Sequence, residues 1–193
     1  MSCIIDKGRS HFPCNTNAGG LKAMYVLAAF DRDLKSTADI SQGVMSGSGT
    51  DPINVYKFDL EADENTFVEE NEVSRGAGTS IFTSTGTLQF AKQGSDSHTI
   101  FQKLSKQRCQ LILEDHNGLM RFVGLEHGVD FTVGTTSGGA LGDMSGYNVT
   151  FSGKELELAP FVEGDLVGTS ASDFLIQSTT IEPGNEPTDD TAF

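Results

Sequence analysis

A hairpin signal in the second half of the chain constrains the fold more than any other feature. Two β-favouring runs, Cys109–Leu113 and Leu119–Leu125, flank the dipeptide Asn117-Gly118. Asn-Gly between two such runs is the strongest short-range sign of a β-hairpin, because a type I′ turn needs positive φ at both central residues. The sequence therefore predicts two antiparallel strands joined by that turn.

Two more β-favouring segments follow this hairpin. The chain returns through residues 129–133, crosses a glycine-rich loop and closes with residues 147–151. We therefore expect four strands between residues 109 and 151. No stretch of comparable clarity carries catalytic chemistry, so these residues predict a soluble β-rich domain.

Four upstream segments also have the composition of strands. They lie at residues 21–31, 53–60, 65–73 and 80–91. The first is ambiguous, because its alanines would suit a helix, whereas a preceding glycine pair and its aromatic and β-branched residues favour a strand.

Two of these segments predict features of their surroundings. Tyr56 and Phe58 lie on the opposite face from Val55, so we expect both faces of that strand to be covered. In the last segment the apolar positions change parity at Gly86, which predicts a bulge or bend there.

One helix is expected between the last of these strands and the hairpin. Ser95 or Asp96 is the expected N-cap, accepting from the free amides of the first turn. Ile100, Leu104 and Phe101 form an apolar stripe at helical spacing, which predicts packing against a sheet.

Many strands with a single inserted helix predict a mainly β fold: a β-sandwich or barrel with one flanking α-helix. We expect an N-terminal arm at residues 1–20, a sandwich at residues 21–153 with its helix at about 96–107, and an acidic C-terminal extension at 154–193. Pro160 cannot donate to a ladder and suits an edge strand or an extended arm.

The negative charge of the chain disfavours binding to nucleic acid. Its 193 residues carry a net charge of −14, which opposes binding by phosphate neutralisation. The apolar runs are far short of a membrane span, and the N-terminus lacks the apolar core of a signal peptide, so we expect synthesis in a cytosol.

One segment concentrates the negative charge. Between residues 59 and 72 the chain has seven acids and no base, interleaved with Phe67 and Val68. This pattern predicts a strand with one acidic face; an ordinary solvent-facing strand is the alternative. The acids are Asp59, Glu61, Asp63, Glu64, Glu69, Glu70 and Glu72.

The cysteines give little support to a metal site. Cys3, His11 and Cys14 invite a zinc interpretation, but their spacing matches no common four-ligand site, so we expect a plain loop and no metal. Cys109 begins a strand and is expected to be a small buried hydrophobe.

Catalytic motifs are equally weak. Glu126-His127-Gly128 lies between two strands, but no nucleophile stands at a defined spacing, so we expect a turn histidine. The glycine-rich loop at residues 137–146 lacks the ending of a phosphate loop. We therefore expect no enzyme activity and no cofactor.

A set of short motifs supports a sharper hypothesis. The motifs are Lys7-Gly8-Arg9, Pro13-Cys14, Gly19–Ala23, Thr66–Arg75, Glu114–Gly118, Gly124–Gly128 and Gly142–Gly153. With them the chain resembles structural proteins of tailed phages and prophages of the Bacteroidetes group, over roughly residues 7–153.

The resemblance implies a virion component, the tail tube protein. Such proteins share a β-sandwich with a flanking helix and form hexameric rings whose inner strands make one barrel, and the stacked rings conduct DNA. The implied partners are further copies of the chain, other tail proteins (terminator, baseplate and, in contractile tails, sheath) and passing DNA that is not specifically bound, with no membrane. The implied location is the virion tail, assembled in the cytoplasm of a bacterial host.

This hypothesis gives roles to particular residues. We assign the acidic face at residues 59–72 to the lumen, where like charge repels DNA within the Debye length. Loops around residues 32–51 and 134–146 would contact adjacent rings or subunits. Their candidate contact residues are Ser46, Gly47, Gly138, Gly139 and Asp143.

Two other functions stay open. The chain could be another virion part, such as a tail terminator, a head–tail joining protein or a capsid decoration protein. It could also be a host-facing binding module, such as an adhesin domain, which would stay monomeric.

Overall fold

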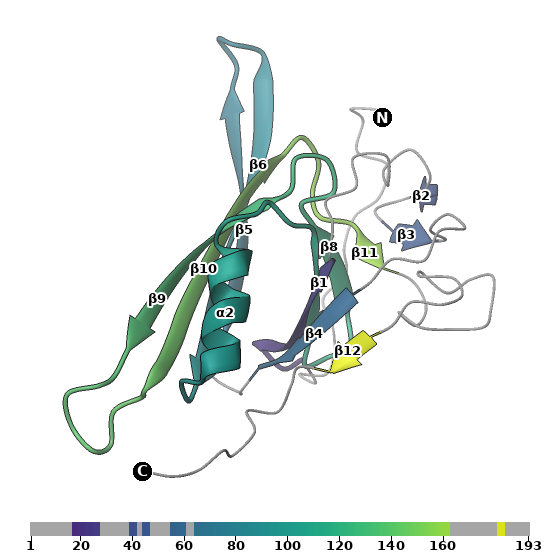
Figure 1. The fold of residues 1–193 in the computed structure, drawn as a ribbon. Helices are drawn as coiled ribbons and strands as arrows, with labels where there is room; N and C mark the ends of the chain where they lie inside the picture. The colour runs from purple at the N-terminus through teal and green to yellow at the C-terminus, as the bar shows by residue number, and fades with distance from the viewer. Residues whose placement is uncertain are drawn as a thin grey trace.

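The computed structural model describes residues 17–27, 39–41, 44–46, 55–60, 64–162 and 181–183. In these residues the protein is mainly β, with two sheets and one helix, so the predicted fold class is confirmed (Figure 1). Several predictions lie outside the described residues. These are most of the N-terminal arm, Cys3, His11, Cys14, Gly47, Glu61, Asp63 and most of the C-terminal extension beyond residue 162.

The larger sheet contains eight strands. In chain order they are β1 (Leu21–Leu27), β2 (Asp39–Ser41), β3 (Val44–Ser46), β4 (Val55–Asp59), β7 (Leu111–Asp115), β8 (Met120–Val123), β11 (Phe161–Val162) and β12 (Ile181–Pro183). Their order across the sheet is β12-β4-β1-β7-β8-β11-β3-β2. The central strands β4, β1, β7 and β8 pair antiparallel, whereas β12 joins β4 and β11 joins β3 in parallel.

The smaller sheet contains four strands and is antiparallel throughout. They are β5 (Thr66–Ser74), β6 (Thr79–Ala91), β9 (Val129–Thr136) and β10 (Gly146–Glu155), in the order β5-β6-β10-β9. The strands expected at residues 65–73 and 80–91 are confirmed, and β10 continues two residues past the expected domain limit at residue 153. Figure 1 shows β5 and β6 projecting as a long hairpin beyond the rest of the sheet.

The helix, α2 (Ser95–Leu104), joins β6 to β7. Its apolar side is formed by Phe101 and Leu104, which are buried, whereas Ile100 is 39% exposed, so the predicted stripe is confirmed only in part. The predicted N-cap is wrong: the cap is Gly94, and no side chain bonds to the free amides there. Within the described part of the chain, no helix combines the length and apolarity that crossing a membrane requires.

The main core lies between the two sheets and is closed by α2. The ring of Phe101 packs on those of Tyr147 and Phe90, with centroids 4.7 and 5.0 Å apart, and Tyr147 also donates a hydrogen bond from its hydroxyl to the carbonyl of Gly94. Aromatic side chains bury large areas, so these contacts fix the helix on the sandwich. Cys109 is buried in the same core, which confirms its predicted place, and burial raises the pKa of its thiol.

The larger sheet also buries side chains on its second face. Val55, Tyr25, Ile112 and others form this second cluster, while Phe58 packs in the main core. Alternate residues of β1, β4 and β7 therefore point to two buried faces. The prediction that both faces of this strand are covered is therefore confirmed at Val55 and Phe58 but is wrong at Tyr56, which is 42% exposed.

The hairpin predicted around Asn117-Gly118 is present, but its turn is of another type. Gly118 has a φ of +78°, whereas Asn117 is not among the residues with positive φ. The amide of Gly118 donates to the carbonyl of Asp115, and that of Asp115 donates to the carbonyl of Leu119. These bonds fit a type I turn followed by a left-handed glycine, so the predicted type I′ turn is wrong.

The predicted bulge at Gly86 is also wrong. The pairing of β6 with β5 and with β10 runs through Gly86 without a register shift. The glycine is needed for space instead, because a Cβ atom there would lie 2.3 Å from the ring of Phe151 and 2.9 Å from the carbonyl oxygen of Thr66. A side chain on the neighbouring strand, rather than an irregular backbone, therefore determines this position.

Candidate assembly surface

One face of the smaller sheet is turned away from the core, and we call it the outer face. Along β10 the pattern is clear, since Tyr147, Val149 and Phe151 are buried while Asn148 and Thr150 between them are exposed. Side chains alternate across a strand, so the outer face collects the exposed positions of all four strands.

A row of threonines crosses the outer face. Thr66 of β5 is opposite Thr87 of β6, Thr87 is opposite Thr150 of β10, and Thr150 is opposite Thr132 of β9. All four side chains are exposed. Threonine is β-branched and suits a strand, and its hydroxyl keeps the surface polar without adding charge.

The next row has a different composition. It contains Val68, Thr85, Ser152 and Asp130 in register across the four strands. Together the two rows line a shallow groove with a volume of about 500 Å³. The sequence analysis missed this surface. Threonine or serine occupies alternate positions of β6 and β10, but only the strand register shows that these residues align in rows.

Asp130, the one acid in these rows, is neutralised by a partner. The guanidinium of Arg108 donates two hydrogen bonds to its carboxylate, at 3.0 and 2.7 Å. The hydrogen bond from Arg108 lowers the pKa of Asp130 below its usual value. The groove is therefore nearly uncharged, and it is lined by threonine and serine hydroxyl groups together with the apolar side chain of Val68.

The predicted acidic face is only partly present. Glu70 and Glu72 are exposed on the outer face, beside the groove. Glu69 has the opposite parity: its carboxylate accepts hydrogen bonds from the hydroxyl of Ser84 and the amide of Ala159. The prediction that all the acids of β5 share one face is therefore wrong for Glu69, which holds a neighbouring segment in place.

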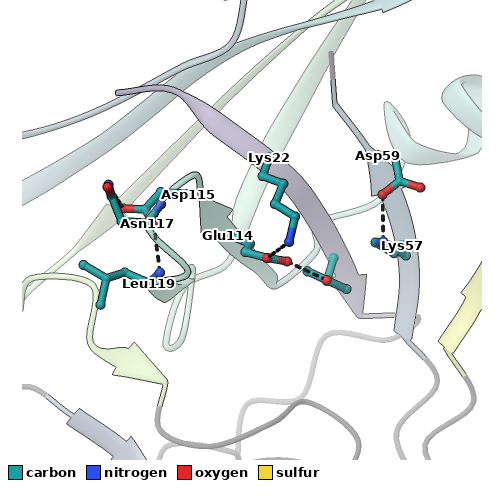
Figure 2. A network of polar contacts seen from close by, with 8 residues as sticks. Lys22, Lys57, Asp59, Glu114, Asp115, Asn117 and Leu119 are labelled. Atoms are coloured by element: carbon teal, nitrogen blue, oxygen red, sulfur yellow. Dashed lines mark hydrogen bonds and ion pairs between the residues drawn. The ribbon is translucent and has the colours of Figure 1, made fainter. Parts of the chain in front are cut away.

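The remaining acids lie elsewhere. Glu64 is exposed just before β5, and Asp59 belongs to β4 of the larger sheet, where it is 2.7 Å from the ammonium of Lys57 (Figure 2). The structure therefore brings together Glu70 and Glu72, and does not place Asp59 with them. Sequence proximity was misleading because β4 and β5 belong to different sheets.

In the part of the chain that the structure describes, no further strand extends the smaller sheet beyond β5 or β9. Among the described residues, β5 pairs only with β6, and β9 pairs only with β10 apart from one bridge between Val129 and Cys109. In that bridge the amide and carbonyl of Val129 both bond to Cys109. Because these directions alternate along a strand, the amides of Phe131, Val133 and Thr135 also point away from β10.

The predicted contact loop after β9 is an ordered turn. The carboxylate of Asp143 accepts hydrogen bonds from the amides of Gly139 and Ala140, both at 2.8 Å, and these bonds lower its pKa. Gly138 has a φ of +68°, and a Cβ atom there would lie 2.6 Å from the Cβ atom of Asp143. Leu141 is fully exposed at this loop, a contact candidate that the sequence analysis missed. Of the other predicted contact residues, Ser46 is the last residue of β3 and pairs with Asp39, so the prediction of a loop at this position is wrong.

Figure 2 shows a polar network on the larger sheet that explains local structure. The carboxylate of Glu114 accepts hydrogen bonds from the ammonium of Lys22 and the hydroxyl of Tyr25. Burial by itself would raise the pKa of Glu114, but these two bonds outweigh it and the pKa lies below its usual value. Burial, followed by the bond to Glu114, raises the pKa of Tyr25.

The same network includes the β7–β8 turn. The carboxylate of Asp115 accepts hydrogen bonds from the amides of Asn117 and Leu119, at 2.8 and 2.9 Å. The side-chain amide of Asn117 donates to the carbonyl of Ala18, and its oxygen accepts from the amide of that residue. Asn117 therefore tethers the segment before β1 to the turn, which is a structural role.

Searches with this chain found no match among protein-family models, curated proteins or solved structures.

Proposed function

We propose that this protein is a tail tube subunit whose smaller sheets join edge to edge into a ring, and whose rings stack into a conduit for DNA. The observation that carries the proposal is the smaller sheet itself. It has four antiparallel strands, two edges free of further strands among the described residues, and a polar outer face.

The strand count supports closure into a ring. β5 and β9 run in opposite directions, because each neighbour in the order β5-β6-β10-β9 reverses direction. When β9 of one copy lies beside β5 of the next, the new pair is antiparallel as well. The pattern then continues through every copy, and a head-to-tail contact of this kind closes when its rotation completes a circle. Closure removes the exposed edges, which are otherwise sites of aggregation.

The outer face is suited to line a passage for DNA. The threonine row offers hydroxyl groups without charge, and Glu70 and Glu72 add negative charge beside it. The basic side chain of Arg108 is engaged by Asp130, although Lys154 is exposed in β10. A polyanion finds few cations to bind on such a surface, so its affinity for the wall is low.

The ends of the smaller sheet supply contacts for stacking. The β5–β6 turn lies beyond the end of β10, and the β9–β10 loop lies at the opposite end, as Figure 1 shows. Val73 is 62% exposed near the first end, and Leu141 is fully exposed at the second. A ring built from these sheets would present one set of tips on each of its two rims.

A proline substitution at the outer edge of β9 tests whether this strand joins neighbouring copies in the ring. Thr135 is exposed and its amide points away from β10, so Thr135→Pro removes a donor that only an incoming strand would use. Thr135→Val keeps that amide and serves as the control. We expect the wild type and the valine variant to form hollow rods in negative-stain images, and the proline variant to stay monomeric with the same circular dichroism spectrum.

Other outcomes would favour another function. Closed rings that never stack would favour a terminator or joining protein, and a wild type that stays monomeric at high concentration would contradict the proposal. Rods formed equally well by the proline variant would show that β9 is not the joining edge.

A further inference from the structure

The loop between β8 and β9 meets the end of β10 at a cluster of three possible metal ligands. They are the imidazole of His127 and the carboxylates of Glu126 and Glu155, with one ligand atom from each within 4.8 Å of the others. The sequence analysis treated His127 as a turn residue. We propose that these three side chains form a binding site for a divalent ion of the zinc class.

The separation of two of the ligands already matches a bound metal. Nδ1 of His127 lies 3.3 Å from Oε2 of Glu155. Two ligands about 2.0–2.2 Å from a tetrahedral zinc ion lie roughly 3.3–3.6 Å apart. The ligand oxygen of Glu126 lies within 4.8 Å of both of these atoms, so it reaches the same separation by a shift of at most about 1.5 Å. Its side chain is only partly buried.

The carboxylate of Glu155 is held in place by its other oxygen. Oε1 accepts hydrogen bonds from the amides of Glu126 and His127, at 3.1 and 2.8 Å. These bonds leave Oε2 directed at the imidazole. Hydrogen bonds that orient a ligating carboxylate in this way are typical around metal ions and increase their affinity.

The ligand types select the kind of ion. One imidazole nitrogen with two carboxylate oxygens suits zinc and similar transition metals, whereas calcium and magnesium prefer oxygen ligands alone. Three protein ligands leave a fourth position for water or for a group from another molecule. The bound ion would fasten the β8–β9 loop to the last residue of β10, where that strand leaves the smaller sheet.

The simplest alternative is that His127 and Glu155 form only an ion pair. Titration calorimetry with zinc chloride on the metal-free full chain separates the two cases. We expect one zinc ion per chain in the wild type, and an affinity at least about tenfold lower in both His127→Ala and Glu126→Gln. His98→Ala is the matched control, because His98 is an exposed histidine of α2 outside the cluster, and it should bind as the wild type does.

A second control addresses Cys3 and Cys14. A chain with both replaced by serine should keep its zinc affinity. The inference is overturned if the wild type binds no zinc, if His127→Ala and Glu126→Gln bind as tightly as the wild type, or if binding is lost only with the two cysteines. None of these results depends on whether the protein forms tubes.

Discussion

At the scale of single residues, one glycine depends on a side chain across the sheet. A Cβ atom at Gly86 would overlap the ring of Phe151, which is buried in the main core. We expect Gly86→Ala to lower the free energy of unfolding by about 1–3 kcal/mol, as other overpacked cores do. Gly76→Ala is the control, because nothing lies within 4 Å of the position that its Cβ atom would take.

Urea unfolding of both variants measures this difference. An equal stability for Gly86→Ala and Gly76→Ala would show that Phe151 does not pack on β6 as described.

The Glu114 carboxylate gives a prediction about pH. Its folded-state pKa lies below the usual value of 4.5. The ionised carboxylate therefore stabilises the fold at pH values above about 4.5. This stabilisation is lost as the pH falls through the folded-state pKa. We expect Glu114→Gln to cost about 1 kcal/mol at pH 7, a modest value because Lys22 is exposed to solvent.

The difference in stability between the wild type and Glu114→Gln should therefore disappear below about pH 4.5. Thermal unfolding of both proteins from pH 7 to pH 3 measures this difference. A difference that increases on acidification would contradict the assigned hydrogen bonds.

At the scale of elements, the sequence predicts which strands and which helix are present better than it predicts their turns and caps. The β7–β8 hairpin, the helix and the main strands follow from local composition and are present. The turn type was missed, because the carboxylate of Asp115 caps the amides of Asn117 and Leu119 and so favours another geometry. The helix cap was missed as well, because the helix begins after Gly94 without a side-chain hydrogen bond to its first amides, so the capping preference of serine and aspartate did not locate it.

The observed geometry of the β7–β8 turn leads to a prediction about Gly118. Gly118 has a φ of +78°, and no atom lies within 4 Å of the place where a Cβ would stand, so only backbone strain opposes a side chain there. We expect Gly118→Ala to cost about 1–2 kcal/mol in unfolding free energy. Gly142→Ala is the control, because that glycine is equally open and has no positive φ. Identical melting temperatures for the two variants would contradict this turn geometry.

At the scale of the whole molecule, the two-sheet sandwich with one helix follows from counting strands and their connections. The candidate surface does not, because it depends on strand pairing between distant residues. Thr66 and Thr132 belong to one row only because β6 and β10 lie between them. Glu69 and Glu70 are adjacent in the sequence and yet lie on opposite faces, which a count of charges does not reveal.

The central claim concerns how copies of this molecule meet. The most direct measurement is cryo-electron microscopy of the purified full chain at high concentration. We expect hollow tubes in which β9 of each subunit continues into β5 of the next, with Thr87, Glu70 and Glu72 facing the lumen. Tubes with these side chains on the outer wall, or particles no larger than a single chain, would contradict it.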